Sequence, residues 1–301
     1  MNILITGSSG FIGISLVQYL KNNYNIIGLD IDDSSKYLCK YFIKIDITNK
    51  DKLEKVFTIY NIDYIIHCAF DKSLKNCEEN KKRAYNINYI GSKNLYEFSK
   101  KYNSKFIFIS SDQVFDGKNG FYLENSKTNP INYYGKLKLD IEELIKSDKC
   151  SSICRTALVF GEIPSSQKTL FNNLKDSNTL VVQGYIVQHI IYKLSNKSII
   201  KLPIDDFITP TSANMLSLQI KTIIENNLYG TFHCCGSESI SRYEFGIKIA
   251  NHFLLDKSYI QPIEHIDKLR PKNVSLDFTY SENILGIKYE NLESALNDFK
   301  I

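Results

Sequence analysis

The sequence predicts an α/β protein with a Rossmann-type, doubly wound parallel sheet and a smaller C-terminal lobe. The first 160 residues alternate short apolar runs with longer stretches of helical period, which is the pattern of βαβ units. A glycine-rich turn, Gly7 to Gly13, directly follows the first apolar run. Right-handed crossovers put helices on both sheet faces and bring the carboxyl ends of the strands to one edge, so we expect ligands to bind there.

The expected elements follow the chain in order. Strands are predicted at Asn2–Ile5, Asn25–Leu29, Tyr41–Ile45, Tyr64–His67, Phe106–Ile109 and Ser152–Ala157. Helices are predicted at Phe11–Lys21, Lys50–Tyr60, Glu79–Tyr102 and Tyr134–Lys146. After Gly161 the alternation weakens, and a later apolar run at Thr231–Cys235 is expected to return to the sheet. We therefore expect residues 1–160 to form the dinucleotide-binding domain and residues 161–301 to form mainly the substrate-binding lobe, with a strand near 230–236 in the sheet.

Composition narrows the class of protein. The chain has 301 residues, 43% hydrophobic and 23% charged, and its formal net charge of +4 is spread thinly, so a nucleic-acid surface is not indicated. Seven cysteines without a C-x-x-C pair favour a reducing compartment, and five scattered histidines show no metal-ligand spacing. Neither a signal-peptide pattern nor an apolar run of ~18 residues occurs. The expectation is a cytoplasmic enzyme without a metal or a membrane span.

The strongest local signal is Gly7-x-x-Gly10-x-x-Gly13 between a predicted strand and a predicted helix. The first glycine permits the tight turn, the second lets the backbone approach a pyrophosphate, and the third allows close helix packing. The N–H groups of the helix N-terminus then face the phosphates. The predicted cofactor-binding residues of this turn are Gly7, Ser9, Gly10, Phe11 and Ile12. A glycine turn without a ligand is the alternative interpretation.

The second predicted strand is followed by Asp30, where a carboxylate would bind the hydroxyl groups of the adenosine ribose. A carboxylate there would repel a 2′-phosphate, so NAD(H) is favoured and NADP(H) is the alternative. Asp32 and Asp33 compete with Asp30 for this role.

Tyr134 and Lys138 lie four residues apart in a predicted helix and therefore on one face. A nearby ammonium favours the phenolate and lowers the tyrosine pKa toward the range useful for proton transfer. Tyr133 lies one residue away but has Leu137 at the corresponding position. Ser111 follows a predicted strand that ends at the same sheet edge, and its hydroxyl can bind a carbonyl oxygen together with the tyrosine. The three side chains are predicted to form a proton-delivery group beside a nicotinamide.

With these residues in view, the chain resembles the extended short-chain dehydrogenases/reductases and, among them, the dTDP-4-dehydrorhamnose reductase family, over nearly its whole length. Besides the glycine turn and Tyr-x-x-x-Lys, the matching segments are Ser110-Ser111-Asp112-Gln113-Val114-Phe115-Asp116-Gly117, Pro130-Ile131-Asn132-Tyr133-Tyr134-Gly135-Lys136, Arg155-Thr156 with Val159-Phe160-Gly161, Pro210-Thr211-Ser212-Ala213, Gly230-Thr231-Phe232-His233 and Arg270-Pro271-Lys272-Asn273-Val274-Ser275-Leu276-Asp277.

The resemblance implies roles for individual residues. Ser111 would bind the carbonyl, Tyr134 would be the acid, and Lys138 would activate it and bind the cofactor ribose. Further cofactor contacts implied are Asp46, Ile47, Cys68, Ala69 and Phe70. Implied substrate contacts are Ser111, Asp112, Gln113 and Arg270, and Asn88 would support the active site from its helix. Arg270 could instead anchor the C-terminal lobe, and Asn88 could be a polar residue of a helix interior.

The chain departs from the family pattern at three places. Gln113 replaces the family's usual tyrosine, and Ser111 replaces its usual threonine while keeping the hydroxyl. The segment from Gly161 to Pro210 is longer than usual and poorly matched. In the family, this segment normally helps to enclose the nucleotide sugar. The departures therefore bear on which sugar nucleotide the protein binds.

The resemblance implies reduction of the C4 ketone of a nucleotide-activated 4-keto-6-deoxy sugar, in deoxysugar and polysaccharide biosynthesis. Two alternatives use the same fold. One is a nucleotide-sugar epimerase or dehydratase with tightly bound NAD, and Asp112 beside Ser111 keeps it open. The other is a non-catalytic, NAD(P)-binding regulatory subunit. The expected partner is a nucleotide sugar, and a homodimer is compatible with the sequence.

Overall fold

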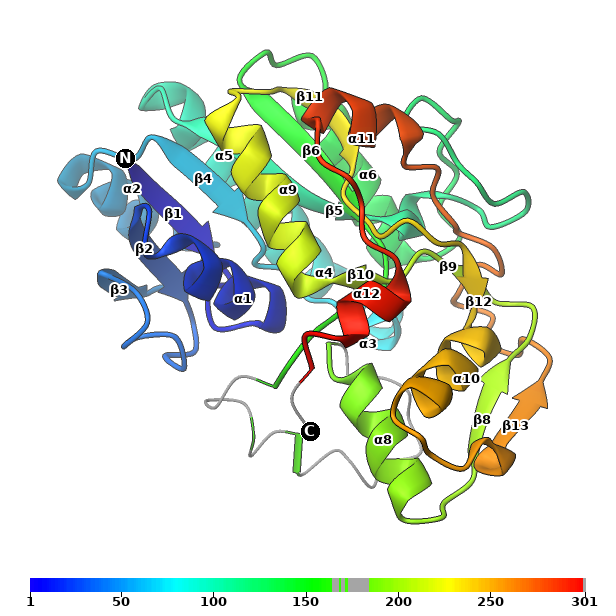
Figure 1. The fold of residues 1–301 in the computed structure, drawn as a ribbon. Coiled ribbons are helices and arrows are strands. Elements are labelled where there is room, and N and C mark those ends of the chain that lie inside the picture. The colour runs from blue at the N-terminus through cyan, green and yellow to red at the C-terminus, as the bar shows by residue number, and fades with distance from the viewer. Residues whose placement is uncertain (164–167, 169–170, 173–183, 300–301) are drawn as a thin grey trace.

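The computed structural model describes residues 1–163, 168, 171–172 and 184–299. Its largest element is a seven-stranded parallel sheet with the order β11-β6-β5-β4-β1-β2-β3 (Figure 1). The strands are β1 (Asn2–Thr6), β2 (Asn25–Asp30), β3 (Tyr41–Lys44), β4 (Tyr64–His67), β5 (Lys105–Ser111), β6 (Ser151–Thr156) and β11 (Gly230–His233). The structure thereby confirms the predicted α/β fold class.

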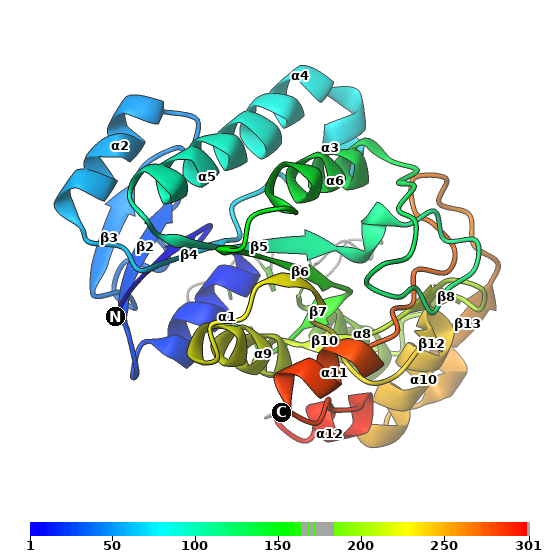
Figure 2. The same cartoon turned by 90° about the horizontal axis from the view of Figure 1, so that it is seen from above.

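Helices cover both faces of the sheet, as Figure 2 shows from above. One face carries α2 (Lys50–Ile59), α5 (Gly91–Lys101) and α6 (Tyr133–Ile145), and the other carries α1 (Phe11–Leu20), α9 (Ala213–Glu225) and α11 (Thr279–Leu285). Neighbouring strand residues point to opposite faces. Ile3 of β1 therefore packs in the α1/α9 layer, whereas Leu4 packs in the α2/α5 layer. Burial of strands on both faces explains their continuous apolar runs.

The predicted helix Glu79–Tyr102 is divided in the structure. It is preceded by α3 (Leu74–Glu79), which ends where the predicted helix begins, and its own parts are α4 (Lys81–Ala84), a π-helical segment η1 (Tyr85–Ile90) and α5. Asn80 interrupts the helix because it has non-helical φ and caps the next segment by accepting a hydrogen bond from the N–H of Arg83. The π segment contains Asn88, whose side chain is fully buried. A single helical period in the sequence thus corresponds to a helix with two irregularities.

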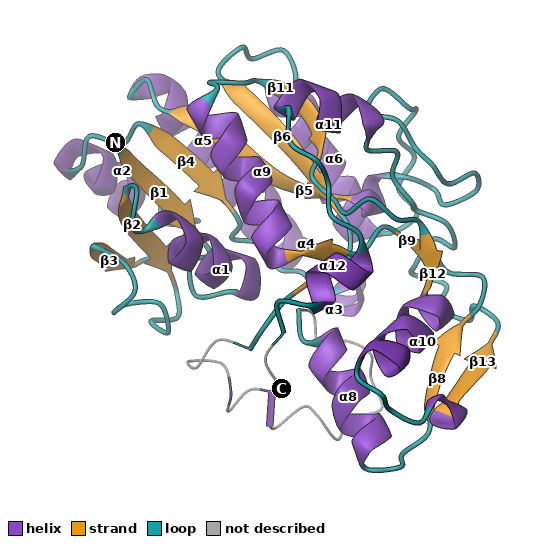
Figure 3. Ribbon diagram, in the orientation of Figure 1, coloured by secondary structure: helices purple, strands orange, loops and turns teal. Residues whose placement is uncertain are grey.

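The C-terminal lobe has its own small core. Its strands form pairs, with β7 (Val159–Phe160) beside β10 (Thr211–Ser212), β8 (Ile200–Pro203) beside β13 (Ile260–Ile263), and β9 (Phe207–Ile208) beside β12 (Ile240–Ser241). Figure 3 shows α8 (Ile186–Ser195) and α10 (Arg242–His252) beside the β8/β13 pair, and α12 (Leu292–Leu296) lies against α10 and β10. Buried side chains from all three helices, among them Ile190, Ile249 and Leu296, form one cluster with Phe160.

Three C-terminal elements pack on the N-terminal sheet. Helix α9 lies against α1, β11 pairs in parallel with β6, and α11 contacts both α9 and β11. In the register of that pair, Phe232 lies opposite Cys154. The chain therefore crosses from the sheet to the lobe, back to the sheet and out again, so the core of the sheet includes residues from both halves of the sequence.

Among the helices of the described ranges, none combines the length and the apolar character that a membrane crossing requires. Residues 164–167, 169–170 and 173–183, which belong to the segment that matches the family pattern poorly, lie outside the described residues.

Candidate active site

The site lies where the strand order reverses. Strands β1 and β4 are neighbours in the sheet, but the chain leaves β1 for β2 on the other side and reaches β4 later. Open α/β sheets bind ligands at such a switch point, outside the carboxyl ends of the strands. The glycine turn follows β1, and Cys68, Ala69 and Phe70 follow β4, so both segments meet at this edge.

The glycine turn leaves no space for side chains at two of its three glycines. Gly7 has φ +69, and a Cβ there would lie 2.6 Å from the backbone N of Ala69. A Cβ on Gly13 would lie 2.0 Å from the carbonyl oxygen of Gly7. Gly10 is exposed, and a Cβ on it would meet only that same oxygen, at 3.3 Å. The turn thus presents an open backbone at the N-terminus of α1, which fits a pyrophosphate.

Asp30 at the end of β2 is bound to the same turn. Its Oδ2 accepts a hydrogen bond from the N–H of Ser9 at 2.9 Å, and its Oδ1 accepts one from the N–H of Asp32 at 3.1 Å. Burial raises the pKa of the Asp30 carboxyl, and these N–H groups partly offset that effect. The hydroxyl of Ser9 donates to the carbonyl oxygen of Asp32 at 2.8 Å, which ties the turn to the segment after β2.

Phe11 and Ile12 begin α1, but the side chain of Phe11 points into the protein. It is 6% exposed and packs edge-on against Tyr185 of the C-terminal lobe, with ring centroids 5.4 Å apart. Ile12 is half-buried against the same cluster. Cofactor contacts from these positions would therefore come from the backbone, while the side chains fix the start of the helix.

Asp46 and Ile47 form the turn after β3. The Oδ1 of Asp46 accepts hydrogen bonds from the N–H and the hydroxyl of Thr48, at 2.9 and 2.8 Å. Ile47 is buried against Gly91 of α5, where a Cβ would lie 2.6 Å from its Cδ1. Asp46 itself is exposed at the sheet edge, so its side chain shapes a turn that a bound adenine could contact.

His67, at the end of β4, has a structural role that the sequence did not indicate. Its two ring nitrogens lie 2.7 Å from the hydroxyls of Thr6 and Ser92, so the ring joins β1 to α5. Burial, with a contribution from the charge of Lys138, lowers the pKa of His67 to about 3. The imidazole is therefore neutral at physiological pH and fixes the chain just before Cys68.

Ser111, Tyr134 and Lys138 come together at the ends of β5 and α6. The Ser111 hydroxyl is close enough to Tyr134 to lower the pKa of its phenol. The Nζ of Lys138 lies 5.7 Å from the centre of the Tyr134 ring and donates a hydrogen bond to the carbonyl oxygen of Ile109 at 2.6 Å. Burial lowers the pKa of Lys138 to about 7 and raises the pKa of Tyr134 above its ordinary value. The structure thus places a hydroxyl, a phenol and an ammonium side by side.

Asn132 orients the start of α6, and the sequence motif contained it without assigning it a role. Its Oδ1 caps the helix by accepting from the N–H of Gly135 at 2.7 Å. Its Nδ2 donates to the Oε1 of Gln113 at 3.1 Å and to the carbonyl oxygen of Leu269 at 2.8 Å. A Cβ on Gly135 would lie 2.1 Å from the carbonyl oxygen of Gln113, so only glycine lets the helix approach so closely. Asn132 therefore links Tyr134 to both sides of the site.

Asp112 lies in the same network. Its Oδ1 accepts from the hydroxyl of Ser111 at 2.8 Å and from the Nε2 of Gln113 at 3.2 Å. Burial raises the pKa of the Asp112 carboxyl, whereas these hydrogen bonds and the charges of Arg242 and Arg270 lower it. In this arrangement the serine proton is directed toward Asp112.

Arg270 is close enough to affect both Asp112 and Tyr134, but its ion pair is with Asp267, at 3.1 Å. Sequence reasoning missed its neighbour Arg242, the first residue of α10, whose Nε donates to the Oδ2 of Asp206 at 2.9 Å. The two guanidinium groups also affect one another. Burial lowers the pKa of Arg270, and the positive charge of Arg242 lowers it further. The lobe thus brings two arginines toward Asp112.

Asn88 supports the loop after β4. Its Oδ1 accepts from the N–H of Asp71 at 2.6 Å, and its Nδ2 donates to the carbonyl oxygen of the same residue at 3.1 Å. The Asn88 side chain thus satisfies both backbone groups of Asp71, in the loop that carries Phe70. Asn88 lies in the π-helical segment rather than in a regular α-helix.

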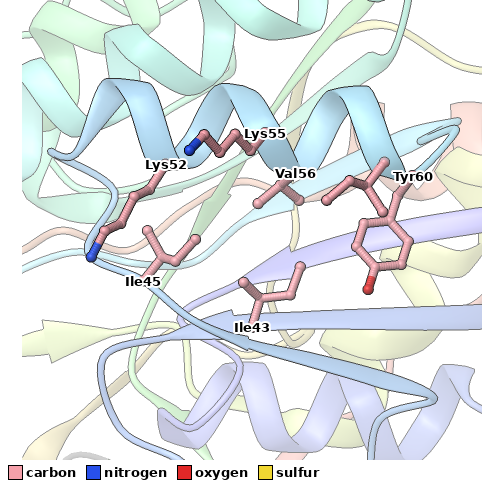
Figure 4. A pocket seen from close by; sticks show the side chains of 7 residues that line it. Ile43, Ile45, Lys52, Lys55, Val56 and Tyr60 are labelled. Atoms are coloured by element: carbon pink, nitrogen blue, oxygen red, sulfur yellow. The ribbon is translucent and has the colours of Figure 1, made fainter.

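A surface groove between α2 and β3 contains none of the predicted site residues. Figure 4 shows it lined by apolar side chains of both elements, with Lys52 and Lys55 at its border. The groove belongs to the outer edge of the sheet and not to the switch point.

The fold and this arrangement define an extended short-chain dehydrogenase/reductase: a parallel sheet with a glycine turn at its switch point and Ser, Tyr and Lys at the next strand and helix. Residues 1–300 match the family model described as RmlD substrate binding domain. The chain belongs to this family.

Individual relatives have different names. The chain is 28% identical over 318 residues to a dTDP-4-dehydrorhamnose reductase of Aggregatibacter actinomycetemcomitans, covering 99% of this chain and 98% of that protein. It is 26% identical over 294 residues to methionine adenosyltransferase 2 subunit beta of Bos taurus, covering 95% and 82%. A crystal structure of dTDP-4-dehydrorhamnose reductase from Bacillus anthracis in complex with NADP has a TM-score of 0.82 at 26% identity, covering 99% and 96%.

Proposed function

We propose that this protein uses NAD(P)H to reduce the C4 ketone of a nucleotide-activated 4-keto-6-deoxy sugar. The observation that carries the proposal is the proximity of Tyr134 to both Ser111 and Lys138 at the sheet edge that also holds the glycine turn. The likeness to dTDP-4-dehydrorhamnose reductases over 99% of the chain supports the choice of substrate class.

The residues divide the chemistry as follows. A bound NAD(P)H supplies the hydride. The Ser111 hydroxyl, which donates to Asp112 in the structure, would turn its proton to the carbonyl oxygen of the substrate. Tyr134 would then give its proton to the alkoxide that develops there. Lys138 stabilises the resulting phenolate by its charge and would hold the cofactor ribose. Asp112, Gln113 and Arg270 would contact the sugar nucleotide from the side of the C-terminal lobe.

We further propose that the cofactor is held by the residues that the sequence indicated. The backbone of Gly7, Ser9, Gly10, Phe11 and Ile12 would bind the pyrophosphate, Asp30 the adenosine ribose, Asp46 and Ile47 the adenine side, and Cys68, Ala69, Phe70, Tyr134 and Lys138 the nicotinamide side. The Asp30 carboxylate favours NADH because it would repel a 2′-phosphate. The Bacillus relative binds NADP, so the comparison must be measured with both cofactors.

The test is a screen for NADH and NADPH oxidation over dTDP-, UDP-, GDP- and CDP-linked 4-keto-6-deoxy sugars. We expect turnover with one class of nucleotide, with consumption of one cofactor per sugar. An epimerase or dehydratase would instead retain NAD through purification and change the sugar without net oxidation of NADH. Absence of turnover with every substrate would contradict the proposal.

A non-catalytic binding subunit is the second candidate, and the likeness to methionine adenosyltransferase 2 subunit beta over 95% of the chain favours it. In that case the purified protein would form a stable complex with a methionine adenosyltransferase catalytic subunit and show no turnover in the screen. Size-exclusion chromatography of the mixture measures the first outcome.

A further inference from the structure

Three aromatic rings surround the ammonium of Lys138. Its Nζ lies 3.7 Å from the ring centre of Phe70, 4.7 Å from that of Phe108 and 5.7 Å from that of Tyr134. The rings come from the loop after β4, from β5 and from α6. We call these three rings the lysine cage. The only hydrogen bond that the described part of the chain shows for this ammonium is the one to the carbonyl oxygen of Ile109.

The cage takes the place of a counter-ion. Lys138 is 4% exposed, and within the described residues no carboxylate lies at ion-pair distance from it. The titratable groups that affect it are Cys68, Glu142, Cys77, His67 and Tyr134. Of these, Glu142 is bound to Arg155 on the far side, and His67 is neutral. A buried cation without a partner is unfavourable, whereas the faces of aromatic rings attract it electrostatically.

Phe70 is the member of the cage that contacts both catalytic side chains. Besides its short distance to Lys138, its ring meets the Tyr134 ring edge to face, with centroids 5.4 Å apart. Phe108 is fully buried in the core of the sheet, whereas Phe70 is only partly buried and lies at the cofactor edge. Phe70 can therefore change without opening the core.

We propose that Phe70 is a positioning residue whose ring face keeps the Lys138 ammonium charged and holds it 5.7 Å from the centre of the Tyr134 ring. This proposal rests on the proposed reductase function for its catalytic consequence, but not for its physical basis. Leucine at this position would keep the apolar surroundings and remove the ring. The pKa of Lys138, which is about 7, should then fall by roughly one pH unit, because burial would continue to penalise the charge without the compensating attraction.

The experiment is a pH titration of the Lys138 13Cε resonance in lysine-labelled protein, assigned by its absence in Lys138→Met. Phe70→Leu is compared with Phe70→Tyr, which keeps the ring, and with Phe253→Leu, a half-buried phenylalanine of the C-terminal lobe. We expect a lower Lys138 pKa only in Phe70→Leu. In the reductase assay the basic limb of the kcat profile should shift by the same amount, and activity at pH 7 should fall roughly threefold to tenfold.

An unchanged Lys138 pKa in Phe70→Leu would overturn the proposal, as would an equal shift in Phe70→Tyr. The resonance titration needs no substrate. If it shows the expected shift while no sugar nucleotide is reduced, the cage stands and the proposed function fails. If turnover is found but the titration shows no shift, the proposed function stands and the role of Phe70 is contradicted.

Discussion

Two buried cations, Lys138 and Arg155, occupy neighbouring sites in the sheet core and have opposite surroundings. Arg155 of β6 is 5% exposed and forms a two-pronged ion pair with Glu142 of α6, with its Nε 3.0 Å from Oε1 and one terminal nitrogen 2.7 Å from Oε2. Lys138 lies one turn earlier on α6, equally buried, and is surrounded by rings and one carbonyl.

The two surroundings suit two different roles: the charge of Arg155 stabilises the fold, whereas the charge of Lys138 can act on a neighbouring group. The Arg155–Glu142 pair is neutral as a unit and holds α6 against β6. Lys138 keeps its charge available to a neighbouring group, at the cost of a pKa lowered to about 7. Asp30 resembles Lys138 because its carboxylate is bound by uncharged groups, the backbone N–H groups of Ser9 and Asp32. Among the described residues, neither Lys138 nor Asp30 has an oppositely charged side chain at ion-pair distance, and both lie at the candidate active site.

The largest expected effect is on catalysis and tests the proposed role of the site around Lys138. Tyr134→Phe removes the proton donor next to Lys138 and should lower kcat by roughly 10²–10⁴-fold, while the Kd for NADH changes less than about twofold. Stopped-flow turnover and fluorescence titration measure the two quantities. Tyr133→Phe, one residue away, is the matched control and should retain activity. Retained turnover in Tyr134→Phe would remove this residue from the mechanism.

The second prediction tests whether the buried Arg155–Glu142 ion pair stabilises the fold. Glu142→Gln keeps the shape of the side chain but leaves Arg155 buried without its carboxylate, so the free energy of unfolding should fall by roughly 3–5 kcal/mol. Glu143→Gln affects an exposed pair with Lys146 and should change the free energy by less than about 0.5 kcal/mol. Urea unfolding measures both. A loss below about 1 kcal/mol in Glu142→Gln would mean that the buried pair does not stabilise the fold as the comparison requires.

The third prediction concerns pH and Lys138. Its folded pKa of about 7 lies below the value of an unfolded lysine, roughly 10.4, so between these values the unfolded chain binds more protons. This group therefore makes the native protein more stable as pH rises, by roughly 2 kcal/mol from pH 7 to pH 9. Lys138→Met should lack that contribution. Parallel stability curves for the two proteins over this range would show that Lys138 has no lowered pKa.

The smallest expected effect concerns the other unpaired ion. Asp30→Asn removes the charge and keeps an oxygen that can accept from the N–H of Ser9. The ratio of kcat/KM for NADH to that for NADPH should fall by roughly tenfold, because a 2′-phosphate would no longer be repelled. Asp33→Asn, at an exposed residue paired with Lys44, is the control. A ratio that is the same in all three proteins would assign cofactor choice to other residues.

The sheet and the central side chains could be predicted from the sequence because their signals are local. Continuous apolar runs identified the strands of the N-terminal half to within one or two residues, and the glycine turn identified the switch point. Ser111, Tyr134 and Lys138 could be brought together in advance because parallel strands end at one edge and residues four apart share a helix face. The structure shows these three side chains in one group.

Long-range pairings could not be predicted in this way. No periodicity of the sequence joins Asp206 to Arg242 or Asn132 to Leu269, since each pair forms only after the lobe has packed on the sheet. The division of the helix near Asn80 and Asn88 also escaped prediction, because both asparagines act through hydrogen bonds to backbone groups rather than through apolar spacing.

The strand that completes the sheet has a consequence for biosynthesis of the chain. β11 pairs with β6 only after the intervening residues have been made, and the hydroxyl of Ser152 finds its acceptor at Leu228, 76 residues later. Until then, one side of β6 carries unpaired backbone groups that could pair with another nascent chain. The returning segment would therefore cover this edge only late in synthesis, and a chain interrupted before β11 would leave the edge of β6 exposed.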